Sequence, residues 1–267
     1  MEWIPRLRAG AKGLSELNSR QWVSGLVISP FGTRVGIRVE QSALLEKLRS
    51  RLLPGWAEEH CEIVDFLWSF TADGRLFYGH EFISGEFLEE FDRRFHIYLG
   101  ATSATHTFLH AGVVAVNGCG ILLPGYSHSG KTSLTQALVL KGATFYSDDL
   151  AVIDGAGRVF PYPKPLTIRT KSNGSYKKAA PMGTATLPSA VVSLVCFLHY
   201  KKGRKTLLRS VPQGAASLLL IQNCLSVREF PSRDIQRISQ VCHTARFYRG
   251  IRGSADTAAD EILNLLA

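Results

Sequence analysis

The sequence contains no long uninterrupted apolar run, although apolar residues make up 45% of its 267 residues. A membrane-spanning helix needs about 18 consecutive apolar residues, and no stretch reaches that length. The first residues, MEWIPRLRAGAKG, also lack the apolar centre of a secretory signal. We therefore expect a globular, cytoplasmic protein with a substantial hydrophobic core and no membrane partner.

The chain contains few cysteines, and their spacing indicates no metal or redox site. The five cysteines are an odd number, and no Cys-x-x-Cys pair occurs among them. This pattern argues against a zinc or redox site and is typical of buried reduced thiols. Zinc-ligand spacing, a stacking-aromatic pattern and a recognition-helix signature are all missing, so we expect no nucleic-acid partner.

Acidic residues are scarce in the second half of the chain. Residues 1–106 contain 12 Lys/Arg and 14 Asp/Glu, a net charge of −2, whereas residues 107–267 contain 19 and 8, a net charge of +11. Bulk positive charge attracts anions without choosing among them. Nucleotide phosphates and an anionic substrate are the explanation that we favour for it.

Residues 1–105 are predicted to form a small α+β domain with a repeated ββα order. Its elements are a hairpin over 22–40, a helix over 42–53, a second hairpin over 61–79 and a helix over 84–99 with Ser84 as its N-cap. No catalytic motif is recognisable in this part. We hypothesise that it recognises the substrate.

Residues 106–267 are predicted to form an α/β domain. Two apolar runs flank Asn117-Gly118, which is a strong hairpin signal. The later elements are a helix over 131–141 closed by Gly142, strands over 143–147 and 190–200, and a mostly helical tail over 213–267 that is interrupted at 245–253.

The segment LLPGYSHSGKTSL, residues 122–134, contains the phosphate-binding loop pattern Gly125-x-x-x-x-Gly130-Lys131-Thr132. Such a loop turns consecutive backbone N–H groups toward phosphate oxygens in conformations that a Cβ atom would obstruct. The following helix adds its positive end, the lysine reaches the β- and γ-phosphates, and the Thr132 hydroxyl is available to Mg²⁺. The residues expected to bind ATP or another nucleoside triphosphate are Gly125, Tyr126, Ser127, His128, Ser129, Gly130, Lys131, Thr132 and Ser133.

Two adjacent carboxylates follow the next predicted strand. Asp148 and Asp149 stand at its end, where a strand–helix–strand unit would bring them beside the loop. Mg²⁺ prefers carboxylate and water oxygens, so one Asp would organise the metal while the other accepts a proton from an attacking hydroxyl. We place Thr132 and Asp149 at the metal, although the sequence leaves the split between the two carboxylates open. An Asx turn that merely closes the strand is the structural alternative.

Residues 110–154 together resemble the catalytic core of the HPr kinase/phosphorylase family and, more remotely, that of the ATP-dependent phosphoenolpyruvate carboxykinases. The resemblance covers a His-Gly-containing strand, a glycine hairpin, the phosphate loop, a helix ending in glycine and the Asp-Asp pair. It implies an α/β phosphate-loop kinase core in residues 106–267, preceded by the small α+β domain. It also implies self-association, because members of this family often form oligomers.

The resemblance also implies roles for individual residues. Lys131 and Thr132 would hold phosphates and Mg²⁺, and Asp148 or Asp149 would be the base for a seryl hydroxyl. His110 would lie near the transferred phosphoryl group. Arg169, at the end of a predicted strand, would stabilise the charge that develops on the phosphoryl oxygens.

The chain departs from the family pattern at several points. The family usually has a glycine where this loop has His128, and an acidic residue where this chain has Leu134. No counterpart of the segment associated with phosphorylase activity is present, the nearest sequence being LTIRTKSNG at 166–174. We therefore expect a kinase and do not expect the dephosphorylating activity.

The sequence thus predicts an ATP- and Mg²⁺-dependent kinase that phosphorylates a hydroxyl group, with a serine of a peptide or protein as the favoured acceptor. Two alternatives remain open at this stage. One is a nucleotide-gated binding module without transfer activity, and the other is a kinase for a small metabolite.

Overall fold

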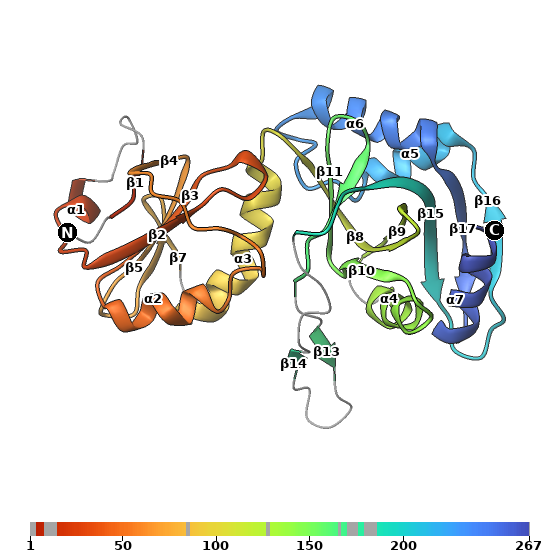
Figure 1. Cartoon of the computed structure of the whole chain (residues 1–267), viewed down its shortest axis with the longest axis horizontal. Coiled ribbons are helices and arrows are strands. Elements are labelled where there is room, and N and C mark those ends of the chain that lie inside the picture. Colours follow the sequence, from red (N-terminus) through yellow and green to blue (C-terminus); the bar gives the residue numbers. More distant parts are fainter. Residues whose placement is uncertain are drawn as a thin grey trace. The chain divides into compact units, whose positions relative to one another are not determined.

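The computed structural model of the chain describes residues 4–7, 15–83, 86–126, 129–164, 167–169, 176–178 and 186–266. The chain divides into two compact units (Figure 1). Unit 1 comprises residues 1–52 and 56–105, and unit 2 comprises residues 53–55 and 106–267. Each unit has its own sheet and its own core.

Unit 1 is built on a five-stranded sheet of order β2-β3-β5-β6-β7. Both predicted hairpins are confirmed, because β2 pairs antiparallel with β3 and β5 pairs antiparallel with β6, while β3 and β5 join the two hairpins in parallel. The strands are β2 (Ser24–Ile28), β3 (Val35–Val39), β5 (Phe66–Phe70), β6 (Leu76–Tyr78) and β7 (Glu81–Ile83).

Two helices of unit 1 differ from their predicted bounds. Helix α2 (Ser42–Arg49) ends four residues before the predicted end, where the Ser50 N–H bonds to the Glu46 carbonyl. Helix α3 (Phe87–Thr102) has Glu86 at its N-cap position. The predicted cap, Ser84, lies outside the described residues. Aromatic residues of α3 pack against the sheet, with the Phe91 and Trp68 rings edge to face at 5.3 Å.

The opposite face of this sheet carries the start of the chain. Strand β1 (Arg6–Leu7) pairs in parallel with β4 (Ile63–Val64), and the short helix α1 (Ser15–Asn18) precedes β2. Leu7 packs there with the buried residues Val27, Val64 and Leu67. Unit 1 therefore has a covered surface on both sides of its central strands.

Unit 2 contains an eight-stranded mixed sheet of order β10-β8-β11-β12-β15-β17-β16, with β9 paired to both β8 and β15. The predicted hairpin at Asn117-Gly118 is confirmed, and both residues adopt positive φ, at +49° and +80°. The strands are β8 (Thr107–Val116), β9 (Cys119–Pro124), β10 (Thr144–Ser147), β11 (Leu150–Ile153), β12 (Arg158–Phe160), β15 (Ala190–Tyr200), β16 (Leu207–Ser210) and β17 (Arg246–Arg252).

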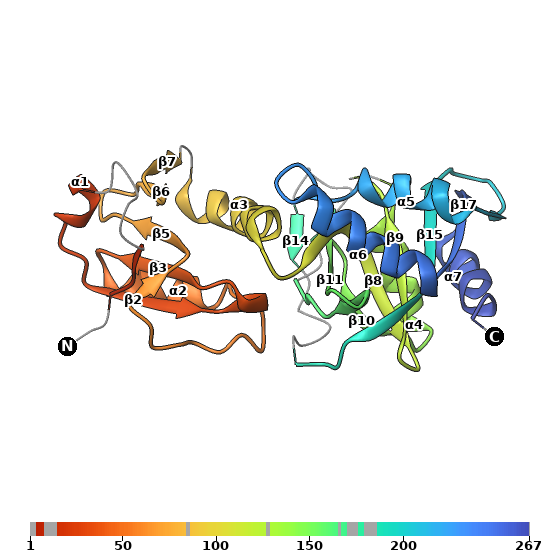
Figure 2. The ribbon, with the colours of Figure 1, turned by 90° about the horizontal axis from the view of Figure 1, so that it is seen from above.

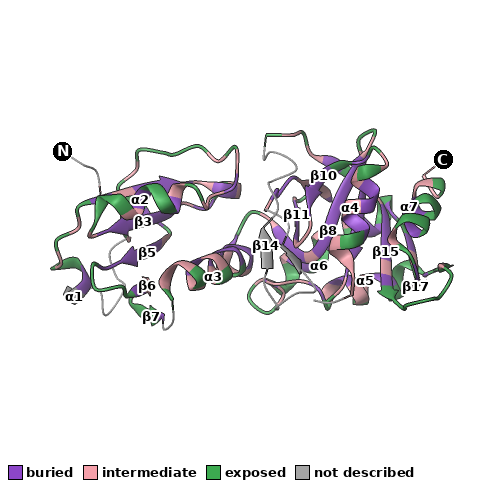
Figure 3. Ribbon diagram, turned by 90° about the horizontal axis from the view of Figure 1, so that it is seen from below, coloured by how far each residue is buried: buried purple, intermediate pink, exposed green. Residues whose placement is uncertain are grey.

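Helices cover both faces of this sheet (Figures 1 and 2). Apolar residues of α5 and α6 pack on one face, and apolar residues of α4 and α7 pack on the other. Most strands between them are buried, whereas the edge strand β16 is largely exposed, as are the outer surfaces of the helices (Figure 3). The helices are α4 (Lys131–Leu140), α5 (Gln213–Ile221), α6 (Pro231–Thr244) and α7 (Ala255–Asn264).

The interruption of the helical tail is a core strand. Residues 245–253 contain β17, which runs parallel to β15 and lies between β15 and the edge strand β16. The connection between β15 and β16 passes through an exposed turn that contains Gly203, and β16 then pairs with β17. The tail thus contributes to the sheet that positions the phosphate loop.

Two short strands, β13 (Thr167–Arg169) and β14 (Tyr176–Lys178), pair with each other in a separate sheet. Over the parts of the chain that the structure describes, no helix is both long enough and apolar enough to cross a membrane.

Candidate active site

The phosphate loop lies where its pattern predicts, between the end of β9 and the start of α4. Gly130 is the N-cap of α4 and has φ +90°, a left-handed conformation that an L side chain rarely adopts. A Cβ atom at Gly125 would approach the Ser129 hydroxyl oxygen to 2.9 Å. Both glycines of the pattern are therefore required by the backbone. Ser127 and His128 lie outside the described residues.

Lys131 is the first residue of α4, and its side chain folds back over the loop. Its ammonium group donates to the carbonyl of Gly125 at 2.6 Å and to that of Tyr126 at 3.0 Å. Burial lowers the pKa of Lys131, and the charges of Asp148 and Asp149 oppose that shift. The Lys131 ammonium group could exchange these two neutral carbonyls for phosphate oxygens, because charged acceptors form stronger hydrogen bonds with a cation.

His110 lies on β8 on the same side of the sheet as α4. Side chains alternate along a strand, so His110 shares a face with Gly112 and Val114. A Cβ atom at Gly112 would meet the hydroxyl of Thr135 in α4 at 2.7 Å, and Val114 packs in the α4 core. His110 is therefore directed toward the face that bears the loop. Its carbonyl also accepts a hydrogen bond from Gly125 N–H, which ties β8 to the loop.

Asp148 contacts the helix that follows the loop. The Thr132 hydroxyl donates to Asp148 Oδ2 at 2.7 Å. Burial raises the pKa of Asp148 to about 6, with a further rise from Asp149, against the opposing effects of Thr132 and Lys131. Within the described residues, the other carboxylate oxygen, Oδ1, is buried and makes no hydrogen bond of normal geometry. Asp148 is thus a mostly buried carboxylate that accepts from Thr132, and a Thr135 hydroxyl interaction also lowers its pKa.

Asp149 has different partners. Its Oδ1 lies 3.1 Å from Nε2 of His110, and its Oδ2 accepts from Nζ of Lys164 at 3.1 Å. Burial alone would raise the pKa of Asp149, but the hydrogen bonds and charges of His110 and Lys164 outweigh it and bring the pKa well below its usual range. Its side chain is 44% exposed. Asp149 is therefore an ionised, accessible carboxylate held in place from two sides.

Local backbone geometry explains why neighbouring carboxylates face different groups. The Ser147 hydroxyl accepts hydrogen bonds from the N–H groups of Asp149 and Leu150, which fixes the turn between β10 and β11. Ala111 N–H also donates to the Asp149 carbonyl. The turn thus has structural hydrogen bonds of its own, and both carboxylates remain directed at other groups.

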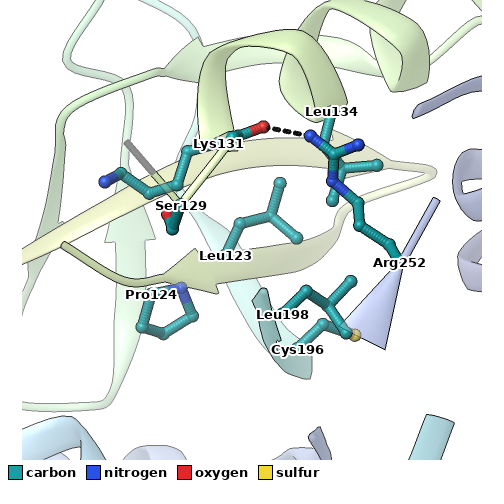
Figure 4. Close-up of a pocket in the computed structure, with 9 residues that line it drawn as sticks. Leu123, Pro124, Ser129, Lys131, Leu134, Cys196, Leu198 and Arg252 are labelled. Carbon is teal, nitrogen blue, oxygen red and sulfur yellow. Dashed lines mark hydrogen bonds between the residues drawn. The ribbon is translucent and has the colours of Figure 1, made fainter. Parts of the chain in front are cut away.

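Arg252 completes the surroundings of the loop and had no signal in the sequence. Its Nη2 donates to the carbonyl of Gly130 at 2.7 Å and to the hydroxyl of Ser133 at 2.8 Å. Figure 4 shows the guanidinium beside the start of α4, next to the small apolar pocket formed by Leu123, Leu134, Cys196 and Leu198. The side chain lies over the Tyr200 ring, and the residue is only 2% exposed.

The remaining predicted residues occupy less central positions. Tyr126 is 68% exposed, and the hydroxyl of Ser129 is buried. Ser133 donates to the Gly130 carbonyl and so helps to close the first turn of α4. Arg169 belongs to the separate β13-β14 pair, and its side chain lies outside the described part of the chain. Lys164, like Arg252, was missed by sequence reasoning, because one lysine in a proline-rich segment carries no pattern.

The oxygen donors at the site fit a nucleotide-bound Mg²⁺ better than a resident metal. Across the described residues, no group of three or more His, Cys, Asp and Glu side chains could hold an ion. Mg²⁺ usually keeps several waters and needs only one or two protein oxygens when phosphates supply the rest. The Thr132 hydroxyl and the adjacent carboxylate of Asp148 would meet that requirement.

Comparisons with solved structures give remote structural similarities. No protein-family model matches the chain, and no curated protein matches it in sequence. Among solved structures, the HPr(Ser) kinase/phosphatase from Coxiella burnetii is similar at 13% sequence identity and a TM-score of 0.30, over 60% of this chain and 99% of that chain. A likeness this weak assigns the chain to no family, so its function is argued from the site.

Proposed function

We propose that the protein is a kinase that transfers a phosphoryl group from a Mg²⁺-bound nucleoside triphosphate, most simply ATP, to a hydroxyl group. The observation that supports this best is the pair of adjacent carboxylates beside the phosphate loop. Asp148 accepts a hydrogen bond from Thr132, and Asp149 contacts the side chains of His110 and Lys164. A nucleotide site and a second, separately held carboxylate are the two parts that transfer to a hydroxyl requires.

The phosphates would bind at the N-terminus of α4. Backbone N–H groups of the loop and the positive end of the helix supply fixed partial charges there. Lys131 would exchange the carbonyls of Gly125 and Tyr126 for oxygens of the β- and γ-phosphates. This movement of the Lys131 side chain would cost little free energy, because the ammonium group already lies at the loop.

Mg²⁺ would be held by Thr132 and Asp148. When bound, the Mg²⁺ ion would neutralise part of the negative charge of the phosphates. The sequence favours Asp149 as the metal ligand. The hydrogen bond from Thr132 to Asp148 instead favours Asp148 as the metal ligand and Asp149 as the base.

Asp149 would then act on the acceptor. The hydroxyl oxygen forms a bond to the γ-phosphorus as the bond from that phosphorus to the β,γ-bridging oxygen breaks, and the nucleoside diphosphate leaves. Asp149 orients the hydroxyl and takes its proton, while His110 and Lys164 fix the carboxylate. A carboxylate of low pKa is a weak base, which suffices because the transition state of phosphoryl transfer is loose and needs little proton removal early on.

We propose a serine of a peptide or protein as the acceptor and unit 1 as the part that recognises it. The resemblance of residues 110–154 to HPr kinases supports a seryl acceptor. Unit 1 has a sheet and a core of its own, as a separate recognition domain would.

The test is transfer of label from γ-labelled ATP to a panel of serine-containing peptides and proteins in the presence of Mg²⁺. Lys131→Ala removes the ammonium group at the loop, and we expect it to reduce transfer by roughly 100-fold or more. Lys202→Ala changes an exposed lysine in the turn after β15 and should leave the rate unchanged. A Lys131→Ala variant as active as the parent would rule out the proposal. Binding of ATP without any labelled product across peptides, proteins and small alcohols would instead indicate a nucleotide-gated binding module.

A further inference from the structure

An arginine lies on a buried face of the unit 1 sheet. On this face, Gly25 pairs with Arg38 across β2 and β3, and Arg38 pairs with Ser69 across β3 and β5. The glycines leave room for the start of the chain, because a Cβ atom at Gly25 would come within 2.4 Å of Pro5 and one at Gly36 within 2.8 Å. Residues 4–7 therefore lie across the glycines, and Arg38 is buried beside them.

Arg38 is 1% exposed, and the contacts it makes are to neutral groups. Its Nε donates to the Ser69 hydroxyl at 2.8 Å, and its Nη1 donates to the side-chain oxygen of Asn18 at 3.0 Å. The guanidinium lies 4.2 Å from the centre of the Trp22 ring. Its third nitrogen, Nη2, is buried and has no hydrogen-bond partner among the described residues.

A buried guanidinium without a counter-ion is costly. Removing a charge from water is penalised by several kcal/mol unless an opposite charge and full hydrogen bonding compensate it. No ion pair to a carboxylate is found for Arg38 within the described part of unit 1. Burial and the nearby charge of Arg6 lower the pKa of Arg38 to about 10, which is the electrostatic signature of missing negative charge.

The space next to Arg38 is a cavity of about 350 Å³. That volume is in the range of small-ligand pockets and far exceeds the room that one water needs. Arg6 and Arg38 line it without a carboxylate partner in the described structure, whereas the third arginine, Arg20, pairs with Glu40. Amide groups of Asn18 and Gln21 complete the polar lining. The described lining of the cavity thus offers positive charge and amide groups and no carboxylate.

We propose that this cavity in unit 1 binds an oxyanion, the carboxylate or phosphate group of a ligand, through Arg38 and Arg6. Arg6 is exposed at the cavity, whereas Nη2 of Arg38 is buried and has no partner among the described residues, so the Arg38 side chain would move toward the bound group to donate to it. Arginine pairs with carboxylate and with phosphate oxygens through two parallel hydrogen bonds. The site is separate from the phosphate loop and does not depend on kinase activity. If unit 1 recognises the substrate, the anion is an acidic or phosphorylated residue of that substrate.

The test uses the full chain and the indole N–H signal of Trp22, which donates to the Leu17 carbonyl and lies against Arg38. The signal is assigned by its loss in Trp22→Phe. Two-dimensional ¹H–¹⁵N spectra are recorded while inorganic phosphate or N-acetylglutamate amide is added, with N-acetylglutamine amide as the neutral probe. Because the phosphate loop also attracts phosphate, the titration is repeated in Lys131→Ala.

We expect the Trp22 signal to shift in a saturable way with one or both anions at low millimolar concentration, and equally in Lys131→Ala. Tighter binding of phosphate would identify a phosphorylated ligand, and tighter binding of the glutamate probe an acidic side chain. Arg38→Met should abolish the shift, whereas Arg93→Met, at an exposed position of α3, should retain it. Arg6→Gln, at an exposed residue, should weaken binding by roughly threefold to tenfold without loss of folding.

Thermal melting separates this role from a structural one. Arg38→Met should change the melting temperature little, because removal of a buried charge without a carboxylate partner offsets the loss of the hydrogen bonds to Ser69 and Asn18. A large drop in melting temperature would mean that Arg38 serves stability, and it would overturn the proposal. A Trp22 signal that stays in place up to about 50 mM of either anion, or that responds equally to the neutral probe, would overturn it as well.

Discussion

At the scale of single residues, the two adjacent carboxylates have opposite electrostatics. Asp148 lies in a buried position that raises its pKa to about 6, and Asp149 is held ionised by His110 and Lys164. Neither difference follows from the sequence, where the two residues are chemically identical neighbours. Their roles are set by contacts from β8 and α4, and by Lys164 after β12.

The difference predicts opposite effects of the two Asp→Asn substitutions on stability. A carboxyl whose pKa is raised on folding contributes stability below its unfolded pKa, and this is lost as the pH rises through about 6. At pH 8, Asp148→Asn should therefore stabilise the metal-free protein, by about 1–3 kcal/mol. This gain should fade as the pH falls below 6 and vanish near pH 4.

Asp149 has a lowered pKa, so its contribution to stability is present above the unfolded pKa and is lost at lower pH. At pH 7, Asp149→Asn should cost about 0.5–1 kcal/mol, since its carboxylate is partly exposed.

Urea unfolding at pH 4, 6 and 8 in the presence of a chelator measures both effects. Glu261→Gln, at an exposed carboxylate of α7 for which no ion pair is described, reports any general effect of removing a negative charge. Equal destabilisation by Asp148→Asn and Asp149→Asn at pH 8 would contradict the assignment of the two environments.

The need for Gly125 and Gly130 could be predicted from the sequence, but the contact of Gly130 with Arg252 could not. The spacing of Gly125 and Gly130 predicts positions that need a bare backbone, and the left-handed φ of Gly130 agrees. The sequence does not reveal that a Cβ atom at Gly130 would also meet Nη2 of Arg252 at 2.3 Å. That contact joins residues more than a hundred positions apart, so no local pattern encodes it.

At the scale of elements, Arg252 links the end of β17 to the first turn of α4. One nitrogen donates both to the Gly130 carbonyl and to Ser133, and burial lowers the pKa of the guanidinium while nearby Tyr200 raises it. The strand that interrupts the helical tail therefore positions the helix that follows the phosphate loop. The tail was predicted as mostly helical, and its periodicity gives no hint of this link.

Loss of this link should weaken nucleotide binding as well as folding. Arg252→Met removes three charge-assisted hydrogen bonds, to the carbonyls of Gly130 and Gly253 and to the hydroxyl of Ser133, and should cost about 2–3 kcal/mol of stability. It should also raise the dissociation constant for Mg-ATP by roughly tenfold, because the loop loses its support. Arg252→Lys, which keeps the charge, should recover part of both losses. Arg249→Met, at an exposed position of the same strand, is the control. An Arg252→Met variant that is less stable but binds nucleotide as tightly as the parent would limit Arg252 to a packing role.

Elements with strong local signals were predicted well. The hairpins at Asn117-Gly118 and Ala72-Asp73-Gly74 and the helix after the loop all occur as expected. Pairing between distant segments was not predictable. Strand β8 separates β10 from β9 in the sheet, and β15 pairs with both β9 and β17. Such pairings depend on how the apolar faces pack together, which a single sequence does not specify.

At the scale of the whole molecule, the two units have separate cores, and the proposed nucleotide site lies within unit 2 alone. Its residues run from His110 to Arg252, all after the boundary at residue 106. Unit 1 holds the cavity beside Arg38. The basic charge of the second half is accordingly in the unit that would bind the triphosphate.

This separation predicts that residues 106–267 bind Mg-ATP on their own. We expect a dissociation constant within about threefold of that of the full chain, because every described contact of the site is retained. Circular dichroism verifies that the fragment is folded, and calorimetry measures the affinity. Transfer to a peptide or protein serine should be lost in the same fragment if unit 1 recognises the substrate. A folded fragment without nucleotide affinity would show that the site needs residues outside unit 2.

The most direct test of the proposed nucleotide site is calorimetric titration of the full chain with ATP and with GTP in the presence of Mg²⁺, alongside Lys131→Ala. The proposal predicts saturable binding of one nucleotide per chain with micromolar affinity, weakened at least tenfold in Lys131→Ala and in the absence of Mg²⁺. If the folded protein takes up neither nucleotide, the assignment of a triphosphate site between Gly125 and Thr132 is wrong.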